Sequence, residues 1–178
     1  MITIYLLTGR PGTGKTTIIR EAVARSEAKA GGFYTEEIRN GRIRQGFRVI
    51  TLEGQSVVLA HVDISSLYRV SKYRVNTGNL DRVGVVALHQ AIRESDVIVI
   101  DEIGKMELFS PYFREAVQKA IGSGKKILGT LMLSRHPFTD EIRQHPNAKI
   151  VHVSRANHDQ VLEDVVRWLK LTTDENSP

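Results

Sequence analysis

The sequence predicts an α/β fold of three layers, in which a mainly parallel sheet lies between helices and carries an antiparallel insertion. Short β-branched apolar runs alternate with segments of helical spacing along most of the chain, as in βαβ units. One run, residues 97–100, is apolar at every position, which is typical of a strand covered on both faces. Residues 33–62 instead contain successive strand patterns with no helix between them, and so predict an antiparallel hairpin and meander.

The first predicted strand is the apolar run ITIYLL, residues 2–7, which is followed by a glycine-rich turn. After the turn, apolar residues recur at helical spacing, at Ile18, Ile19, Ala22 and Val23. The turn is therefore expected to join a buried strand to a helix.

The predicted insertion begins with two strand patterns, residues 33–39 and 42–52. They are separated by Asn40 and Gly41, the pair best suited to a two-residue type I′ turn. A further short strand is expected at residues 57–62, which completes the meander.

Two helices are predicted on either side of the buried run. Residues 80–94 have an apolar face at helical spacing. Ser110 can cap a second helix with Pro111 as its first residue, and the apolar stripe of that helix ends near Gly122 and Gly124.

The last third of the chain continues the alternation of strands and helices. We expect a strand at residues 126–133, a short helix at residues 138–144 and a final strand at residues 148–153. Residues 157–171 predict a closing helix with Asn157 as its N-cap.

Length and composition suit one domain spanning residues 1–178, because 41% of the residues are hydrophobic and 25% are charged. Only residues 172–178 have the polar composition of a flexible tail.

Cysteine is absent, which excludes disulfides, thiolate metal sites and cysteine nucleophiles. No run approaches the roughly 18 apolar residues of a membrane span, and the N-terminus lacks the features of a signal peptide, so we expect a cytoplasmic protein with no membrane partner.

The formal net charge of +5 favours polyanionic partners, and both nucleotides and nucleic acids meet that description. Charge alone does not choose between them. No feature of the sequence predicts an oligomeric state.

The glycine-rich turn matches the P-loop pattern G-x-x-x-x-G-K-[ST] from Gly9 to Thr16. Glycines let consecutive backbone N–H groups converge on a β-phosphate, and Lys15 can reach the β- and γ-phosphates. The Thr16 hydroxyl is placed to ligate Mg²⁺, and Thr17 to touch the α-phosphate. The alternative is a turn that merely connects two elements, but the strand before it and the helix after it favour phosphate binding.

Asp101 and Glu102 directly follow the buried run. A P-loop needs a second metal partner, usually an Asp at the end of a neighbouring buried strand, and Asp101 is expected to hold Mg²⁺ through a coordinated water. Glu102 can orient and deprotonate a water beside the γ-phosphate, which favours hydrolysis over transfer. The alternatives are an Asp that only ends a strand and a Glu that caps or supports its neighbours.

The string DEIGKMEL, residues 101–108, completes a wider pattern with GRPGTGKTT, GGFYTEEI and GFRVITL earlier in the chain. Together these strings resemble the small P-loop nucleoside-triphosphatase family of thermophilic prokaryotes, which has a human cancer-related nucleoside-triphosphatase as a relative. The resemblance spans nearly the whole chain.

The resemblance implies a P-loop NTPase fold with a RecA-like sheet, dependence on Mg²⁺, and hydrolysis of ATP, GTP and other nucleoside triphosphates to diphosphate and phosphate. Little base selectivity is expected, and the chain contains no Asn-Lys-x-Asp string of the kind that reads guanine. Carried over by position, the residues expected to contact nucleotide are Thr8, Gly9, Arg10, Pro11, Gly12, Thr13, Gly14, Lys15, Thr16, Thr17, Asp101, Glu102, Ile103, Gly104, Lys105, Met106 and Glu107. The expected metal ligands are Thr16 and Asp101, and the expected catalytic residues are Glu102, Lys15 and Lys105.

Several residues carry weaker expectations. Lys105 could supply the extra cation that phosphoryl transfer requires, or could be a solvated lysine in a turn. Thr130 could sense the γ-phosphate, or could be an ordinary strand residue. Arg135, Arg143 and Arg155 are expected to be surface charges.

Four arginines cluster in the predicted hairpin, namely Arg39, Arg42, Arg44 and Arg48. They could bind nucleic acid or cover the nucleotide, and a solvated hairpin face is the alternative. Two other functions therefore stay open: a nucleotide or small-molecule kinase, and a nucleotide-gated nucleic-acid-binding module.

Overall fold

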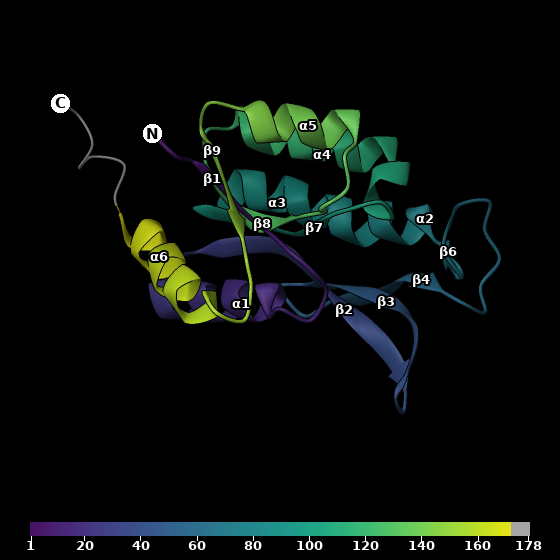
Figure 1. The fold of residues 1–178 in the computed structure, drawn as a ribbon. Helices are drawn as coiled ribbons and strands as arrows, with labels where there is room; N and C mark the ends of the chain where they lie inside the picture. Colours follow the sequence, from purple (N-terminus) through teal and green to yellow (C-terminus); the bar gives the residue numbers. More distant parts are fainter. Residues whose placement is uncertain (172–178) are drawn as a thin grey trace.

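In the computed structural model, which describes residues 1–171, nine strands form one mixed sheet with helices packed on both faces (Figure 1). The strands are β1 (Ile4–Thr8), β2 (Ala30–Asn40), β3 (Ile43–Thr51), β4 (Ser56–His61), β5 (Arg69–Val70), β6 (Tyr73–Val75), β7 (Val97–Ile103), β8 (Lys126–Leu131) and β9 (Ala148–His152). The helices are α1 (Lys15–Ser26), α2 (Thr77–Asn79), α3 (Val86–Glu94), α4 (Pro111–Gly122), α5 (Pro137–Gln144) and α6 (His158–Lys170). A π-helical turn, η1 (Leu80–Val85), joins α2 to α3, and a 3₁₀ turn, η2 (Glu107–Phe109), precedes α4.

The strand order is β5-β6-β4-β3-β2-β7-β8-β1-β9. Strands β2, β7, β8, β1 and β9 form the parallel part of the sheet. On the other side of β2, the pairs β2–β3, β3–β4, β4–β6 and β5–β6 are antiparallel. A parallel half therefore continues into an antiparallel extension. The predicted fold class is confirmed.

Two hydrophobic cores lie on opposite faces of the sheet. One packs α3 and α4 against the sheet, and the other lies beneath α1 and α6. Strand β7 serves both cores, because Ile98 and Ile100 belong to the first and Val97 and Val99 to the second. This double coverage is what its unbroken apolar run predicted.

The predicted start of α4 is confirmed. Pro111 is its first residue, and the Oγ of Ser110 accepts a hydrogen bond of 3.0 Å from the backbone N–H of Phe113. Strand β7, by contrast, runs three residues beyond its predicted end at residue 100, so Asp101 and Glu102 are part of the strand.

The predicted turn at Asn40 and Gly41 is wrong by one residue. Asn40 still belongs to β2 and pairs with Ile43, so the two loop residues are Gly41 and Arg42. Only Gly41 of these two has a positive φ, of 59°, and a type I′ turn needs two. A register shift after Ile38 accompanies this change of pairing.

The predicted helix over residues 80–94 consists of η1 followed by α3, and α2 directly precedes them. Helical structure therefore begins earlier than predicted, at Thr77, where the Oδ1 of Asn76 accepts a hydrogen bond of 2.9 Å from Asn79 N. The short hairpin of β5 and β6 was not predicted, because strands of two and three residues leave too little periodicity to detect.

Asn157 occupies the N-cap position of α6, but its side chain does not cap the helix. It accepts a hydrogen bond from Ser154 N and donates one to the carbonyl of His152. The predicted tail, residues 172–178, lies outside the described residues. Within residues 1–171, none of the helices has both the length and the apolar character needed to cross a bilayer.

Candidate active site

The glycine-rich loop connects β1 to α1 as predicted, and its backbone needs glycine at several points. Gly9, Gly12 and Gly14 have φ values of 146°, 79° and 84°, which L side chains rarely adopt. A Cβ on Gly9 would also lie 2.5 Å from the carbonyl oxygen of Val153. The loop conformation therefore depends on these three residues.

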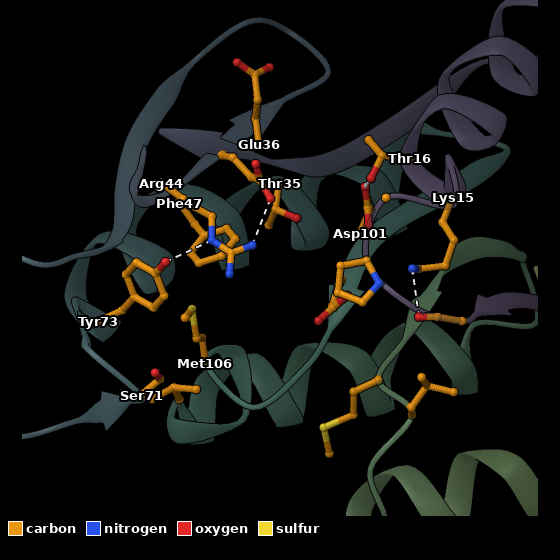
Figure 2. Close-up of a pocket in the computed structure, with 18 of the residues that line it drawn as sticks. Lys15, Thr16, Thr35, Glu36, Arg44, Phe47, Ser71, Tyr73, Asp101 and Met106 are labelled. Carbon is orange, nitrogen blue, oxygen red and sulfur yellow. Dashed lines mark hydrogen bonds and ion pairs between the residues drawn. The ribbon is translucent and has the colours of Figure 1, made fainter. Parts of the chain in front are cut away.

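Lys15 bends back over the loop that precedes it (Figure 2). Its ammonium donates hydrogen bonds of 2.9 Å to the carbonyls of Gly9 and Arg10. Burial lowers the pKa of Lys15, and the nearby charges of Glu102 and Asp101 raise it. The loop thus holds a cation beside two carboxylates.

Asp101 is the centre of a hydrogen-bond network that joins three elements. Thr16, at the start of α1, donates a bond of 2.6 Å to Oδ2, and Thr130, on β8, donates a bond of 2.6 Å to Oδ1. The Asp101 side chain is buried. Burial raises its pKa, while the two threonine bonds and the charge of Lys15 lower it. The structure therefore brings the loop and the acidic strand together.

Glu102 and Glu107 form a carboxylate pair around Gly104. A Cβ on Gly104 would collide with the Glu102 carboxylate and lie 3.0 Å from Glu107 Oε2, so little space separates the two side chains. Burial raises the pKa of Glu102 to about 7, with a further increase from Asp101 and an opposing effect of Lys15. Burial and the charge of Glu102 raise the pKa of Glu107 well above its ordinary value.

Lys15, Thr16, Asp101 and Glu102 line a cavity of about 910 Å³ that extends from the loop to the antiparallel extension (Figure 2). Its far side is formed by residues of β2, β3 and the β5–β6 hairpin, among them Thr35, Arg44, Phe47 and Tyr73. A smaller cavity of about 290 Å³ adjoins it and shares several wall residues with it, including Glu102. The candidate site is thus built by both halves of the sheet.

The predicted contact residues divide into two groups. The large cavity is lined by Gly9, Pro11, Gly12, Gly14, Lys15, Thr16, Thr17, Asp101, Glu102 and Met106. Its walls do not include Thr8, Arg10, Thr13, Ile103, Gly104, Lys105 or Glu107. Thr8 and Ile103 are buried, whereas Lys105 is exposed and lines the smaller cavity together with Glu107. The contact and catalytic roles of both groups stay predictions.

The residues with weaker expectations, Thr130 and three arginines, lie outside the walls of the large cavity. Thr130 is fully buried and holds Asp101 rather than facing the cavity. Arg135 pairs with Asp140 at 2.8 Å, Arg143 bonds to Thr139 Oγ1 at 3.1 Å, and Arg155 is exposed.

Three of the four hairpin arginines, Arg39, Arg42 and Arg44, line the large cavity, and Arg48 does not. Arg39 and Arg44 both pair with Glu37, and Arg44 also donates to the Tyr73 hydroxyl at 2.9 Å. Arg48 lies opposite Glu36 in the β2–β3 ladder. This division gives no support to a nucleic-acid-binding face on the hairpin.

Sequence reasoning missed Thr35 and Tyr73, which the extension contributes to the cavity. The strand pattern predicts Phe47 as a residue of sheet packing, but its side chain lines the cavity as well. Tyr73 gave no signal, since the hairpin that carries it was not predicted.

Thr130→Val is expected to lower the free energy of unfolding by about 1–3 kcal/mol, because a buried carboxylate loses a hydrogen-bond donor. Thr130→Ser keeps the hydroxyl and should lose much less of that stability. Urea denaturation of both variants measures the difference. Equal midpoints for wild type and Thr130→Val would show that this bond adds nothing to stability.

Comparisons with known proteins agree over nearly the whole chain. A family model described as NTPase matches residues 4–166. The chain is 44% identical over 170 residues to the nucleoside-triphosphatase THEP1 of Thermotoga maritima, which covers 96% of this chain and 97% of that protein. The crystal structure of THEP1 from Aquifex aeolicus matches with a TM-score of 0.87 and 36% identity, covering 94% of this chain and 99% of that one. The solution structure of a human cancer-related nucleoside triphosphatase matches with a TM-score of 0.80 and 34% identity, and both chains are covered completely.

Proposed function

The chain belongs to this family of nucleoside-triphosphatases, and from that premise we propose that it hydrolyses nucleoside triphosphates to diphosphate and phosphate with Mg²⁺ and with little base selectivity. One observation carries the proposal. Asp101 lines one cavity together with Thr16, Lys15 and Glu102, and the Thr16 hydroxyl donates a hydrogen bond to its carboxylate. The groups that we propose to bind phosphate, to bind metal and to accept a proton therefore line one cavity.

The oxygen atoms at Asp101 suit a magnesium ion. Mg²⁺ prefers oxygen ligands and is usually bound through one or two protein side chains together with substrate phosphates and water. The Thr16 hydroxyl and the Asp101 carboxylate are 2.6 Å apart, so they can serve as neighbouring ligands. Within residues 1–171, no group of three His, Asp or Glu side chains could hold a metal alone, so the phosphates would complete the site.

The residues of the chain divide the chemistry among them. Backbone N–H groups of the loop and the Lys15 ammonium bind the phosphates and orient them. Bound Mg²⁺ would supply neutralisation of the charge on the phosphate oxygens. Glu102 accepts a proton from a water as the water oxygen forms a bond to the γ-phosphorus, and the bond from the γ-phosphorus to the β–γ bridging oxygen breaks. The electron pair of that bond leaves with the diphosphate.

Little base selectivity is proposed because the groups named above all act on the triphosphate. The described residues also contain no Asn-Lys-x-Asp string. The γ-phosphate end, and not the base, would then determine turnover.

A phosphate-release assay tests the proposal. Purified protein is incubated with ATP, GTP, CTP or UTP in turn, with Mg²⁺ or with EDTA. Release from all four substrates with Mg²⁺ and none with EDTA is expected. Binding of the nucleotides without phosphate release would refute hydrolysis, and release from one substrate alone would refute the low selectivity.

Hydrolysis should increase as the pH rises from about 6 to about 8. Glu102 accepts a proton only as the carboxylate, and its pKa is raised to about 7, so its active form gains population through this interval. Initial rates at saturating nucleotide and Mg²⁺ measure the profile. A flat profile across these pH values would contradict the role of Glu102 as the base.

A further inference from the structure

The large cavity continues past the place expected for the γ-phosphate. Its volume of about 910 Å³ is near the upper end for a ligand site, which is about 300–1,000 Å³. Figure 2 shows Lys15 and Thr16 on one side, Asp101 between, and Arg44, Phe47, Tyr73 and Met106 on the other side. We call this second side the distal lobe.

The distal lobe lies away from the nucleoside of a triphosphate held by the loop. The strand order places β8 and β7 between β1, which precedes the loop, and β2, which begins the far wall. Thr17 is expected at the α-phosphate, and Asp101 and Glu102 at the γ-phosphate. The nucleoside is attached to the α-phosphate, so it leaves the site at the end opposite to the distal lobe.

The floor of the distal lobe is aromatic and firmly held. The rings of Phe47 and Tyr73 have centroids 5.2 Å apart. The Arg44 guanidinium lies 5.1 Å and 5.6 Å from these two centroids, and it is fixed by bonds to Tyr73 and Glu37. Tyr73 itself is buried, and Lys72 also lies 5.5 Å from its ring centroid, so the partly exposed Arg44 guanidinium is the part of this floor on which a planar aromatic group can stack.

The rim of the distal lobe carries two carboxylates, Glu36 and Glu37, that are paired with arginines, and two further cations that are not paired. Arg42 and Lys72 both line the cavity and are exposed. Among residues 1–171, no carboxylate forms an ion pair with either charged group, and the Lys72 ammonium lies 5.5 Å from the Tyr73 ring centroid. Two unpaired cations beside an aromatic floor suit a ligand that carries both an aromatic base and a phosphate.

We propose that the distal lobe binds a second ligand of the nucleoside monophosphate class, beside Glu102 and beyond the γ-phosphate of the bound triphosphate. This proposal rests on the proposed function, which gives the position of the γ-phosphate. The aromatic base lies against Arg44 and Phe47, which Tyr73 supports from below, and the phosphate lies near Arg42 and Lys72. The protein therefore holds two ligands at once, one in each half of the sheet.

Calorimetric titration of the full chain tests this inference. The protein is first saturated with Mg²⁺ and a β,γ-imido analogue of ATP, which occupies the loop without being hydrolysed. AMP, GMP, CMP and UMP are then added in separate titrations, with adenosine and ribose 5-phosphate as partial ligands. At least one monophosphate is expected to bind with a stoichiometry of one, and both partial ligands about tenfold more weakly.

A double variant, Arg42→Ala with Lys72→Ala, should weaken monophosphate binding about tenfold or more. Lys119→Ala with Arg167→Ala removes two exposed cations from α4 and α6 and is the matched control, which should bind as the wild type does. No monophosphate binding with the analogue in place, displacement of the analogue by the monophosphate, or equal affinity in the two double variants would overturn the inference.

Phosphate release from ATP is measured on the same preparations. Hydrolysis without monophosphate binding refutes the second site and leaves the proposed function intact. Monophosphate binding without hydrolysis refutes the proposed function and supports the distal lobe as a site.

Discussion

Glu102→Gln is expected to slow phosphate release about 10²- to 10⁴-fold while nucleotide still binds. The amide fills nearly the same space but cannot accept a proton from water at neutral pH. The loop amides and Lys15, which we propose to bind the phosphates, are unchanged. Single-turnover hydrolysis and equilibrium binding of the same nucleotide measure the two quantities separately.

Glu115→Gln is the matched control for this substitution. Glu115 is an exposed carboxylate on α4 that pairs with Lys119 at 2.7 Å. It should keep the wild-type rate. The Glu102 variant should also lose the increase in rate between about pH 6 and 8, because the group that titrates near 7 is gone. A rate within a few-fold of wild type would show that another group accepts the proton.

Lys15→Met is expected to lower kcat/KM about 10²- to 10³-fold, or about 2.7–4 kcal/mol of transition-state stabilisation. Methionine keeps an unbranched side chain of similar length but removes the cation that faces the phosphates. The fold should be unaffected, because the bonds from Lys15 go only to two carbonyls of its own loop. Steady-state kinetics and thermal unfolding together check this.

The same variant gives a second readout that is independent of nucleotide affinity. Lys15 lowers the pKa of Glu102, so its loss should raise that pKa further and move the pH profile of the residual activity to higher pH. Lys119→Met, which changes an exposed lysine on α4, should change neither kcat/KM nor the profile. Unchanged kinetics in Lys15→Met would remove Lys15 from the phosphate-binding role.

Much of the parallel half could be predicted because its signals are local. Residues 97–100 show their burial on both faces by being apolar at every position, and Ser110 and Pro111 mark the start of α4. The P-loop pattern is local as well, since positive φ values at Gly9, Gly12 and Gly14 are a requirement of the backbone itself. Each of these features depends only on residues that are close together in the sequence.

The antiparallel extension was predicted less well. Its hairpin turn is displaced by one residue, because a register shift after Ile38 changes the pairing in a way that turn composition does not encode. The β5–β6 hairpin is too short to give a pattern. Tyr73, which bonds to Arg44 in the far wall of the cavity, was therefore missed.

By itself, the sequence determined the α/β class, the strand–loop–helix with the P-loop pattern and the two acidic residues of β7, because each of these depends on short-range pattern and backbone geometry. Only the tertiary structure decided which side chains meet: that Thr130 holds Asp101, that Glu107 crowds Glu102, and that Arg44, Phe47 and Tyr73 extend the cavity beyond Glu102. The physical reason is that these contacts join residues far apart in the chain, and burial and charge at each position are set by the elements that pack together there.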